Sequence, residues 1–126
     1  METFSHLKDF ENYINIREGI GRIANNQKIY AKLMASFLKG DYAKQLRNDY
    51  ECSDWAAASA TAHTIKGVAA NLSLTALYDQ SVVLENELRD GQISLASVDL
   101  FCDIWDTTVE YVKEIVDFMA NSPLPL

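Results

Sequence analysis

The stretch "SLASVDLFCDIWDTTVEYVKEIVDFMA", residues 94–120, carries the longest helical pattern in the chain. Its apolar residues recur at alternating steps of three and four, which places them on one face of an α-helix. A second apolar row runs beside the first, and together they make a face wide enough for the interior of a helical bundle. Ser94 is a candidate N-cap for this helix. The first row is Leu95, Val98, Cys102, Trp105, Val109, Val112, Val116 and Met119, and the second is Phe101, Ile104, Thr108, Tyr111, Ile115 and Phe118.

Two more helices are predicted directly upstream. Apolar residues at helical spacing predict one helix over residues 74–88, with Ser73 before it and Gly91 as its C′ residue. Residues 53–72 predict another, with Ser53 as its candidate N-cap. A short turn joins the two helices, so we expect them to pack antiparallel.

A fourth long helix is predicted over residues 26–48. Gly40 lies inside it and costs about 1 kcal/mol relative to alanine, so a kink at that point is compatible with the sequence. The apolar residues of this helix are Ile29, Leu33, Phe37 and Leu46.

The four long helices predict an all-α fold, an antiparallel up-down-up-down four-helix bundle. Two short helical segments, at about 3–12 and 16–24, are expected to cap it. The chain has two prolines, both in the tail "NSPLPL", and no alternating strand pattern. A length of 126 residues suits one domain. We expect residues 1–122 to form this domain and residues 123–126 to be a short C-terminal tail.

Charge and composition argue against several classes of partner. The formal net charge is -7 and no basic cluster stands out, so neither nucleic acid nor an anionic membrane is an expected partner. No apolar run approaches the ~18 residues of a membrane span, and the first residues lack the apolar core of a signal peptide. Cys52 and Cys102 lie far apart without CxxC spacing, which predicts two free, buried thiols. We expect a cytoplasmic protein and a monomer.

The helix predicted over residues 53–72 carries a histidine away from its apolar face. At 100° per residue the apolar residues fall on one arc, and His63 falls on the opposite side. Lys66 at i+3 and Gly67 at i+4 lie beside it, on a face otherwise made of small residues. Glycine leaves room for a large group to approach, and lysine supplies positive charge. The arc expected to face the core is Ala58, Ala62, Ile65, Val68, Ala69 and Leu72.

This combination suits an anionic group bound to, or transferred from, the imidazole of His63. A surface histidine near a lysine is also common, and a face of small residues can simply pack on another helix. Spacing alone therefore leaves both interpretations open. The second histidine, His6, has no comparable surroundings, and we interpret it as a surface residue.

The sequence around His63 resembles the signature of histidine-containing phosphotransfer (HPt) domains. "HTIKG" followed by "AANLS", within residues 63–73, is similar to the family pattern H-x-x-K-G-x-x-x-N-L-G. Residues 18–38 resemble the segment leading into the family's first long helix, and "LENEL", residues 84–88, resembles the end of the helix after the motif. Ser73 departs from the pattern, which has glycine in this turn. Serine tolerates positive φ less well, but Ser73 is a candidate cap for the next helix.

The resemblance implies that His63 accepts a phosphoryl group on Nε2 from a receiver-domain aspartyl phosphate and passes it to another receiver aspartate in a phosphorelay. A neutral imidazole is a competent nucleophile near pH 7. Lys66 would balance the charge of the phosphoryl oxygens, and Gly67 would admit the receiver. The implied partners are response regulator receiver domains and a hybrid sensor histidine kinase.

No intrinsic cofactor is expected from this resemblance, because the magnesium ion belongs to the partner receiver domain. The chain would be a phosphotransfer intermediate and not an enzyme, since it lacks an ATP-binding domain and a glycine loop that cradles phosphates.

Geometry predicts a further group beside the imidazole. If the motif helix and the helix after it pair antiparallel, His63 faces the level of Val82, and Ser81 and Glu85 lie within one turn of that level. Either side chain could accept a hydrogen bond from Nδ1 and leave Nε2 free, and Glu85 could equally be a solvated helix residue. The small residues near His63 that are candidates for receiver docking are Ala56, Ser59, Ala60 and Ala70.

Two other functions fit a helical bundle. A non-phosphorylated interaction module would dock a receiver-like partner without using His63, so His63→Gln would leave partner binding intact. A metal-binding or haem-binding bundle needs several converging ligands, and neither histidine follows a glutamate at i-3 as in di-iron bundles. We therefore expect no metal site.

Overall fold

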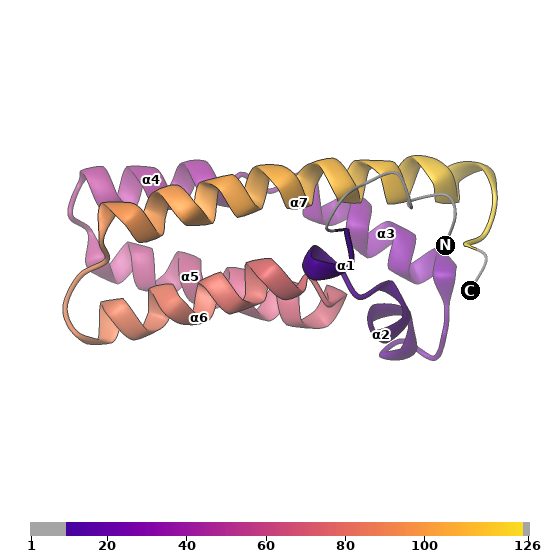
Figure 1. The fold of residues 1–126 in the computed structure, drawn as a ribbon, viewed down its shortest axis with the longest axis horizontal. Helices are drawn as coiled ribbons and strands as arrows, with labels where there is room; N and C mark the ends of the chain where they lie inside the picture. The colour runs from indigo at the N-terminus through magenta and orange to yellow at the C-terminus, as the bar shows by residue number, and fades with distance from the viewer. Residues whose placement is uncertain (1–9, 125–126) are drawn as a thin grey trace.

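The computed structural model describes residues 10–124, which form seven α-helices and no β-strand (Figure 1). The predicted all-α fold is thereby confirmed. His6 and most of the short helix predicted over residues 3–12 lie outside the described residues. The helices are α1 (Phe10–Tyr13), α2 (Ile16–Gly21), α3 (Gln27–Phe37), α4 (Tyr42–Glu51), α5 (Trp55–Leu72), α6 (Thr75–Arg89) and α7 (Leu95–Asn121).

Helices α4 to α7 form the predicted antiparallel up-down-up-down bundle. Each of α5, α6 and α7 runs opposite to the helix before it, and the four helices pack in a ring in which α4 also contacts α7 (Figure 1). Helix α3 lies along the other half of α7. The two short helices pack at one end of the α5–α6 pair, where α1 contacts α6 and α2 contacts α5. They form the expected N-terminal cap.

The helix predicted over residues 26–48 is interrupted, so the prediction of one continuous helix is wrong. α3 ends at Phe37 and α4 begins at Tyr42, and between them the Gly40 N–H donates to the Phe37 carbonyl at 3.1 Å. A Cβ at Gly40 would collide with the ring of Tyr42, so glycine lets this ring close over the turn. Both pieces still pack on α7, and together they fill the fourth position of the bundle.

The core-facing row of α3 also differs from the apolar residues noted in the sequence. Tyr30, Met34 and Phe37 are buried, whereas the Ile29 and Leu33 residues are 44% and 40% exposed. Tyr30, Met34 and Phe37 follow steps of four and three and lie on one face of the helix, which enters the core, while Ile29 and Leu33 on the neighbouring face point outward.

Side-chain caps fix the starts of α5 and α7. The Ser94 side chain accepts a hydrogen bond from the Ser97 N–H at 3.1 Å, which confirms Ser94 as the N-cap of α7. Ser53 is not the N-cap of α5, because it lies in the left-handed region with φ of 52°. Asp54 takes that position, and its carboxylate accepts from the Ala57 N–H at 3.0 Å.

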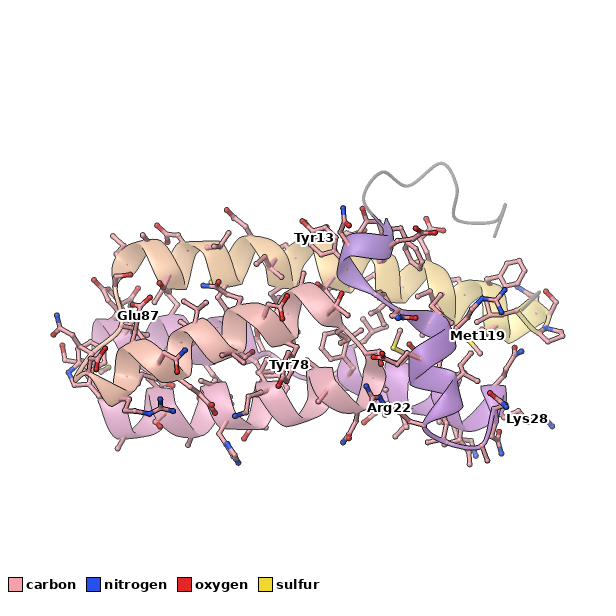
Figure 2. The ribbon with its side chains drawn as sticks, turned by 60° about the horizontal axis from the view of Figure 1, so that its bottom comes forward. Tyr13, Arg22, Lys28, Tyr78, Glu87 and Met119 are labelled. Carbon is pink, nitrogen blue, oxygen red and sulfur yellow. The ribbon has the colours of Figure 1, made fainter. Side chains whose placement is uncertain are left out.

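The turn between α6 and α7 lies at one end of the bundle, where Figure 2 shows Glu87. Gly91 has φ of 128° and donates to the Leu88 carbonyl at 3.1 Å, so its C′ position is confirmed. Glu87 accepts from the Ser94 N–H at 2.7 Å and from the Ser97 hydroxyl. Burial opposes ionisation of this carboxyl, but these hydrogen bonds hold its pKa below the ordinary value.

Both predicted apolar rows of α7 contribute to the core, except for Leu95 at the start of the first row, which is 50% exposed. The Trp105 ring lies 4.9 Å from the Phe37 ring and 6.3 Å from the Phe101 ring, centre to centre. Although α7 is the longest helix, no helix in the described part of the chain combines the length and hydropathy needed to cross a membrane. The buried residues of α7 are Val98, Phe101, Trp105, Thr108, Tyr111, Val112 and Ile115.

After α7 the chain returns to α3. The Leu124 N–H donates to Gln27 Oε1 at 2.7 Å, and the Leu124 carbonyl accepts from Gln27 Nε2 at 3.3 Å. The Leu124 side chain is buried in the hydrophobic core. The segment after α7 is therefore fastened to α3 as far as residue 124.

Candidate functional site

Helix α5 turns its apolar arc inward and His63 outward. Five of the six residues predicted to face the core are buried, and Val68 is half-buried. Three of the five are alanines, whose small side chains let neighbouring helices approach closely. The His63 side chain is 79% exposed, so its ring is accessible to a partner molecule. The buried residues are Ala58, Ala62, Ile65, Ala69 and Leu72.

Glu85 of α6 contacts the imidazole. Its Oε1 atom lies 3.2 Å from His63 Nδ1. Ser81, the other residue predicted at this level, is buried and donates its hydroxyl hydrogen to the Leu77 carbonyl at 2.8 Å. Because Glu85 engages Nδ1, the ring nitrogen left for a reacting group is Nε2.

Lys66 binds the same carboxylate as His63. Its Nζ atom donates to Glu85 Oε2 at 2.6 Å, and its side chain is 32% exposed. The hydrogen bond from Lys66 is the main cause that lowers the pKa of Glu85, and the His63 contact adds to it against the opposing effect of burial. Glu85 is therefore a carboxylate at neutral pH.

The face of α5 around His63 is exposed to solvent and carries mostly small side chains. A Cβ at Gly67 would meet no atom of the described residues within 4 Å beyond its own helical surroundings. The four small residues predicted as a docking surface share this face, three of them exposed and Ala70 half-buried. The three exposed residues are Ala56, Ser59 and Ala60.

A hollow of about 370 Å³ lies where α3, α4 and α5 meet. It is bordered by Leu33 of α3, Tyr42 of α4, and Val68 and Asn71 of α5, so it begins about one turn beyond His63. Helical spacing did not reveal this hollow, because it placed Leu33 of α3 on the apolar face, whereas Leu33 is 40% exposed.

The turn after α5 is built around Ser73, which does not cap α6 as proposed. Ser73 is the C-cap of α5 and has φ of 57° and ψ of 45°, the left-handed conformation that glycine adopts most easily. Its N–H lies near the carbonyls of Ala69 and Ala70, so it closes the last turn of the helix. The N-cap of α6 is Leu74, which makes no side-chain cap.

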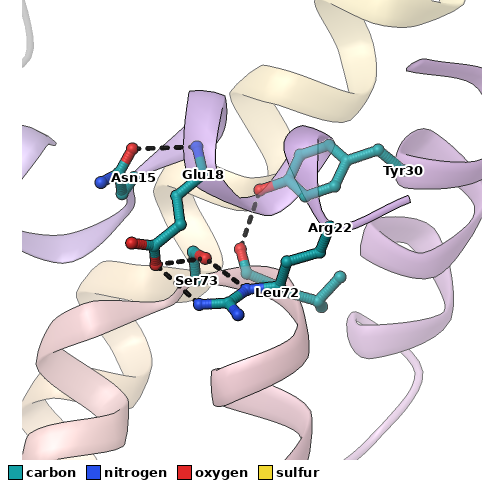
Figure 3. Close-up of polar contacts among 6 residues, drawn as sticks. All are labelled: Asn15, Glu18, Arg22, Tyr30, Leu72 and Ser73. Atoms are coloured by element: carbon teal, nitrogen blue, oxygen red, sulfur yellow. Dashed lines mark hydrogen bonds and ion pairs between the residues drawn. The ribbon is translucent and has the colours of Figure 1, made fainter. Parts of the chain in front are cut away.

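Figure 3 shows that the Ser73 side chain joins this turn to α2. Its hydroxyl donates to Glu18 Oε1 at 2.8 Å and accepts from Arg22 Nε at 3.3 Å, and Arg22 also binds Glu18 at 2.9 Å. The Ser73 hydrogen bond, followed by that of Arg22, lowers the pKa of Glu18. These partners lie far from Ser73 in the sequence, so no local pattern could have identified them.

The backbone of the same turn contacts α2 and α3. The Asn15 N–H donates to the Ser73 carbonyl at 2.9 Å. Figure 3 shows that the buried Tyr30 hydroxyl donates to the Leu72 carbonyl, at 3.0 Å. A Cβ at Gly19 would lie 2.7 Å from the Tyr30 ring and 2.8 Å from the Leu72 oxygen, so only glycine allows this approach. Serine in the left-handed position is thus enclosed by contacts on several sides.

The sequence profile of the Hpt domain family matches residues 40–117, which span α4, α5, α6 and most of α7. The chain belongs to the Hpt domain family. Members of this family act in histidine phosphotransfer within phosphorelays, and they interact with receiver domains. Comparisons with curated proteins and with solved structures give no significant match. Because α1, α2 and α3 precede the matched range, the contacts of Ser73 join the Hpt region to a segment outside it.

Potential metal ligands do not gather near the Hpt motif. Within residues 10–124 no group of three or more His, Cys, Asp or Glu side chains is placed to hold a metal ion. Glu85, the carboxylate beside His63, is engaged by His63 and Lys66.

Proposed function

We propose that His63 of this Hpt domain accepts a phosphoryl group from the aspartyl phosphate of one receiver domain and passes it to the aspartate of another. The observation that carries the proposal is the presentation of the ring: His63 is 79% exposed, and its Nδ1 atom is engaged by Glu85 at 3.2 Å. Such a ring offers one nucleophilic nitrogen, Nε2, to an approaching phosphoryl group.

The transfer needs a nucleophile, correct positioning and stabilisation of charge on the phosphoryl group. In the accepting step, the Nε2 lone pair forms a bond to phosphorus while the bond between phosphorus and the aspartate oxygen breaks, and that electron pair leaves with the aspartate. Nδ1 keeps its proton, which Glu85 accepts in a hydrogen bond. The donating step is the reverse. Positioning and charge stabilisation dominate reactions of this kind.

Lys66 is proposed to balance the charge of the bound phosphoryl oxygens. Its ammonium group sits on Glu85, and the side chain keeps 32% of its surface exposed. A doubly charged phosphoryl group on the neighbouring ring would attract it from the singly charged carboxylate. No cofactor is assigned to this chain, since the magnesium ion of the reaction is proposed to be held by the receiver.

The open face of α5 is proposed as the docking surface for the receiver. Gly67 adds no side chain there, so a receiver active site could reach His63, and the small residues Ala56, Ser59, Ala60 and Ala70 would lie under the partner. The proposed partners are response regulators and the receiver of a hybrid sensor histidine kinase. The chain would act as a phosphotransfer intermediate and not as an enzyme, and a cytoplasmic location and a monomeric state belong to the same proposal.

The proposal is tested by transfer from a phosphorylated receiver domain carrying labelled phosphate. The wild-type chain should acquire a label that is stable to alkali and labile to acid, as expected of phosphohistidine. His63→Gln should acquire none. His6→Gln, which removes the only other histidine, is the matched control and should be labelled like the wild type.

Label on His63→Gln, or loss of label in His6→Gln, would contradict the assignment. A pull-down of the receiver by both variants separates the two candidate functions. If His63→Gln binds the receiver and the wild type never takes up phosphate from several receivers, the chain is a docking module without phosphotransfer.

A further inference from the structure

The carboxylate of Glu85 contacts both His63 and Lys66, the two polar side chains of the proposed site. Glu85 Oε1 lies 3.2 Å from His63 Nδ1, and Glu85 Oε2 accepts from Lys66 Nζ at 2.6 Å. The Glu85 side chain is 17% exposed, so it is more enclosed than either partner. A phosphoryl group on Nε2 would sit on the other side of the ring, so within the ring Glu85 acts on Nδ1 and not on the reacting nitrogen.

The proton on Nδ1 decides how readily phosphohistidine gives up its phosphoryl group. When the bond between Nε2 and phosphorus breaks, its electron pair stays on Nε2. If Nδ1 is protonated, the ring leaves as a neutral imidazole. If Nδ1 is not protonated, the ring must leave as an imidazolate anion, which is a far poorer leaving group. A negative charge at hydrogen-bonding distance favours the protonated ring.

We propose, on the basis of the proposed function, that the negative charge of Glu85 keeps Nδ1 of phosphorylated His63 protonated and so makes its phosphoryl group easier to transfer. This role differs from orientation of the ring. A neutral amide at position 85 would accept the same hydrogen bond and hold the same ring position, but it would supply no charge.

The surroundings of Glu85 support a permanent negative charge. The hydrogen bond from Lys66 holds the pKa of Glu85 below its ordinary value, against the effect of burial and with help from His63. Both of these groups belong to α5. Within residues 10–124, α1 and α7 also pack on α6, but they place no ionisable group that shifts this pKa. If Lys66 turns toward the phosphoryl group, the whole charge of Glu85 acts on His63.

The test compares Glu85→Gln with its parent in a His6→Gln background, so that one histidine remains. Both proteins are phosphorylated with phosphoramidate, which needs no partner, and the loss of phosphohistidine is followed by ³¹P NMR between pH 5 and 9. Asp79→Asn is the matched control, since it removes one exposed carboxylate from the same helix. Glu85→Asp keeps the charge and controls for any disturbance of the fold.

Fast, proton-assisted hydrolysis should extend to higher pH in the parent than in Glu85→Gln. The two profiles should differ by up to roughly one pH unit, so the phosphohistidine of Glu85→Gln should last up to about tenfold longer at pH 8. Asp79→Asn and Glu85→Asp should follow the parent.

Two results are decisive against the inference, and they are distinguishable. Equal profiles for the parent and Glu85→Gln would overturn the role of the charge and leave His63 as the phosphoacceptor. A parent protein that takes no phosphate on His63 from phosphoramidate or from a phosphorylated receiver would overturn the proposed function as well.

Discussion

Glu85 and Glu18 each bring two donors to one carboxylate, but the Glu85 group includes an exposed imidazole, whereas the Glu18 group joins the end of α5 to α2. Glu85 binds the side chains of His63 and Lys66 in the middle of α5, where the imidazole is 79% exposed. Glu18 binds Ser73, which is buried, and Arg22, at the end of the same helix. Similar chemistry thus presents a reactive ring in one place and joins two segments of the chain in the other, where Glu18 and Arg22 are themselves about half exposed.

The difference lies in what surrounds the two carboxylates. The Glu18 group is reinforced by backbone contacts, in which Asn15 donates to the Ser73 carbonyl and Tyr30 to the Leu72 carbonyl. The Glu85 group consists of side-chain contacts between two helices. Contacts made by side chains alone can rearrange when a phosphoryl group binds. Contacts that include the backbone fix the conformation of the turn after α5 and its position against α2 and α3.

The largest expected effect comes from adding one methyl group to a glycine in each of the two regions. Gly19→Ala places a Cβ against the Tyr30 ring and the Leu72 oxygen, so we expect it to destabilise the domain by about 3 kcal/mol. Gly67→Ala is the matched control, since its Cβ meets open space, and it should stabilise the helix by up to about 1 kcal/mol. Urea unfolding measures both. Equal stabilities of the two variants would show that the junction is not tightly packed.

The next effect concerns transfer and not folding. Lys66→Met should slow phosphoryl transfer from a receiver roughly tenfold to hundredfold, because the ammonium that balances the phosphoryl charge is lost. Lys113→Met on α7 is the control, since Lys113 is exposed and pairs with Glu110. Single-turnover transfer measures the rate, and the thermal midpoint of both variants should stay near that of the wild type. An unchanged transfer rate in Lys66→Met would show that Lys66 does not balance the charge of the phosphoryl group.

A smaller effect is expected at Ser73. Ser73→Ala removes the hydroxyl and keeps the left-handed conformation, so it should destabilise the domain by about 1–2 kcal/mol. Ser73→Gly removes the same hydroxyl but relieves the conformation, so it should lie within about 0.5 kcal/mol of the wild type. In a Glu18→Gln background the loss caused by Ser73→Ala should shrink. Equal losses in both backgrounds would mean that Ser73 and Glu18 act independently.

The smallest effect is the contribution of Glu85 to stability at different pH values. Its pKa is lowered below the ordinary value of 4.5, so the pair with Lys66 should contribute its full stability above that pH and lose it as the pH falls through the folded value. Glu85→Gln should therefore cost about 0.5 kcal/mol or less at pH 7 and nothing at pH 2. Urea unfolding at both pH values measures the difference. A loss that persists at pH 2 would point to packing rather than charge.

Most of the fold followed from helical periodicity. The two rows of α7 and the inward arc of α5 are set by spacings of three and four residues, which one helix determines by itself. A kink at Gly40 was considered, but the full break there and the outward position of Ile29 and Leu33 were not predicted. They depend on which row of α3 meets α7, and that choice is made between helices that are distant in the sequence.

The same distinction holds for the site: features set by spacing within one helix were predicted, and features set by packing between distant segments were not. Lys66 and Gly67 stand one turn from His63, so local spacing found them. Glu85 was found because a short turn joins its helix to α5, which fixes the level at which the helices meet. The bond between Glu85 and Lys66 was missed because Lys66 was considered only as a partner for the phosphoryl group. The partners of Ser73 were missed because the docking of α2 depends on tertiary packing outside the Hpt motif.

Helix α7 is continuous and packs against both α3 and α4, so it holds these two helices together across the break between them. Both pieces lie along it, and Gln27 at the start of α3 is fastened to Leu124 beyond its far end. The covalent link at residues 38–41 therefore carries little of the attachment of α3 to the domain. A chain cut at Gly40 should remain one particle in solution, because the two fragments would still share the core that α7 provides.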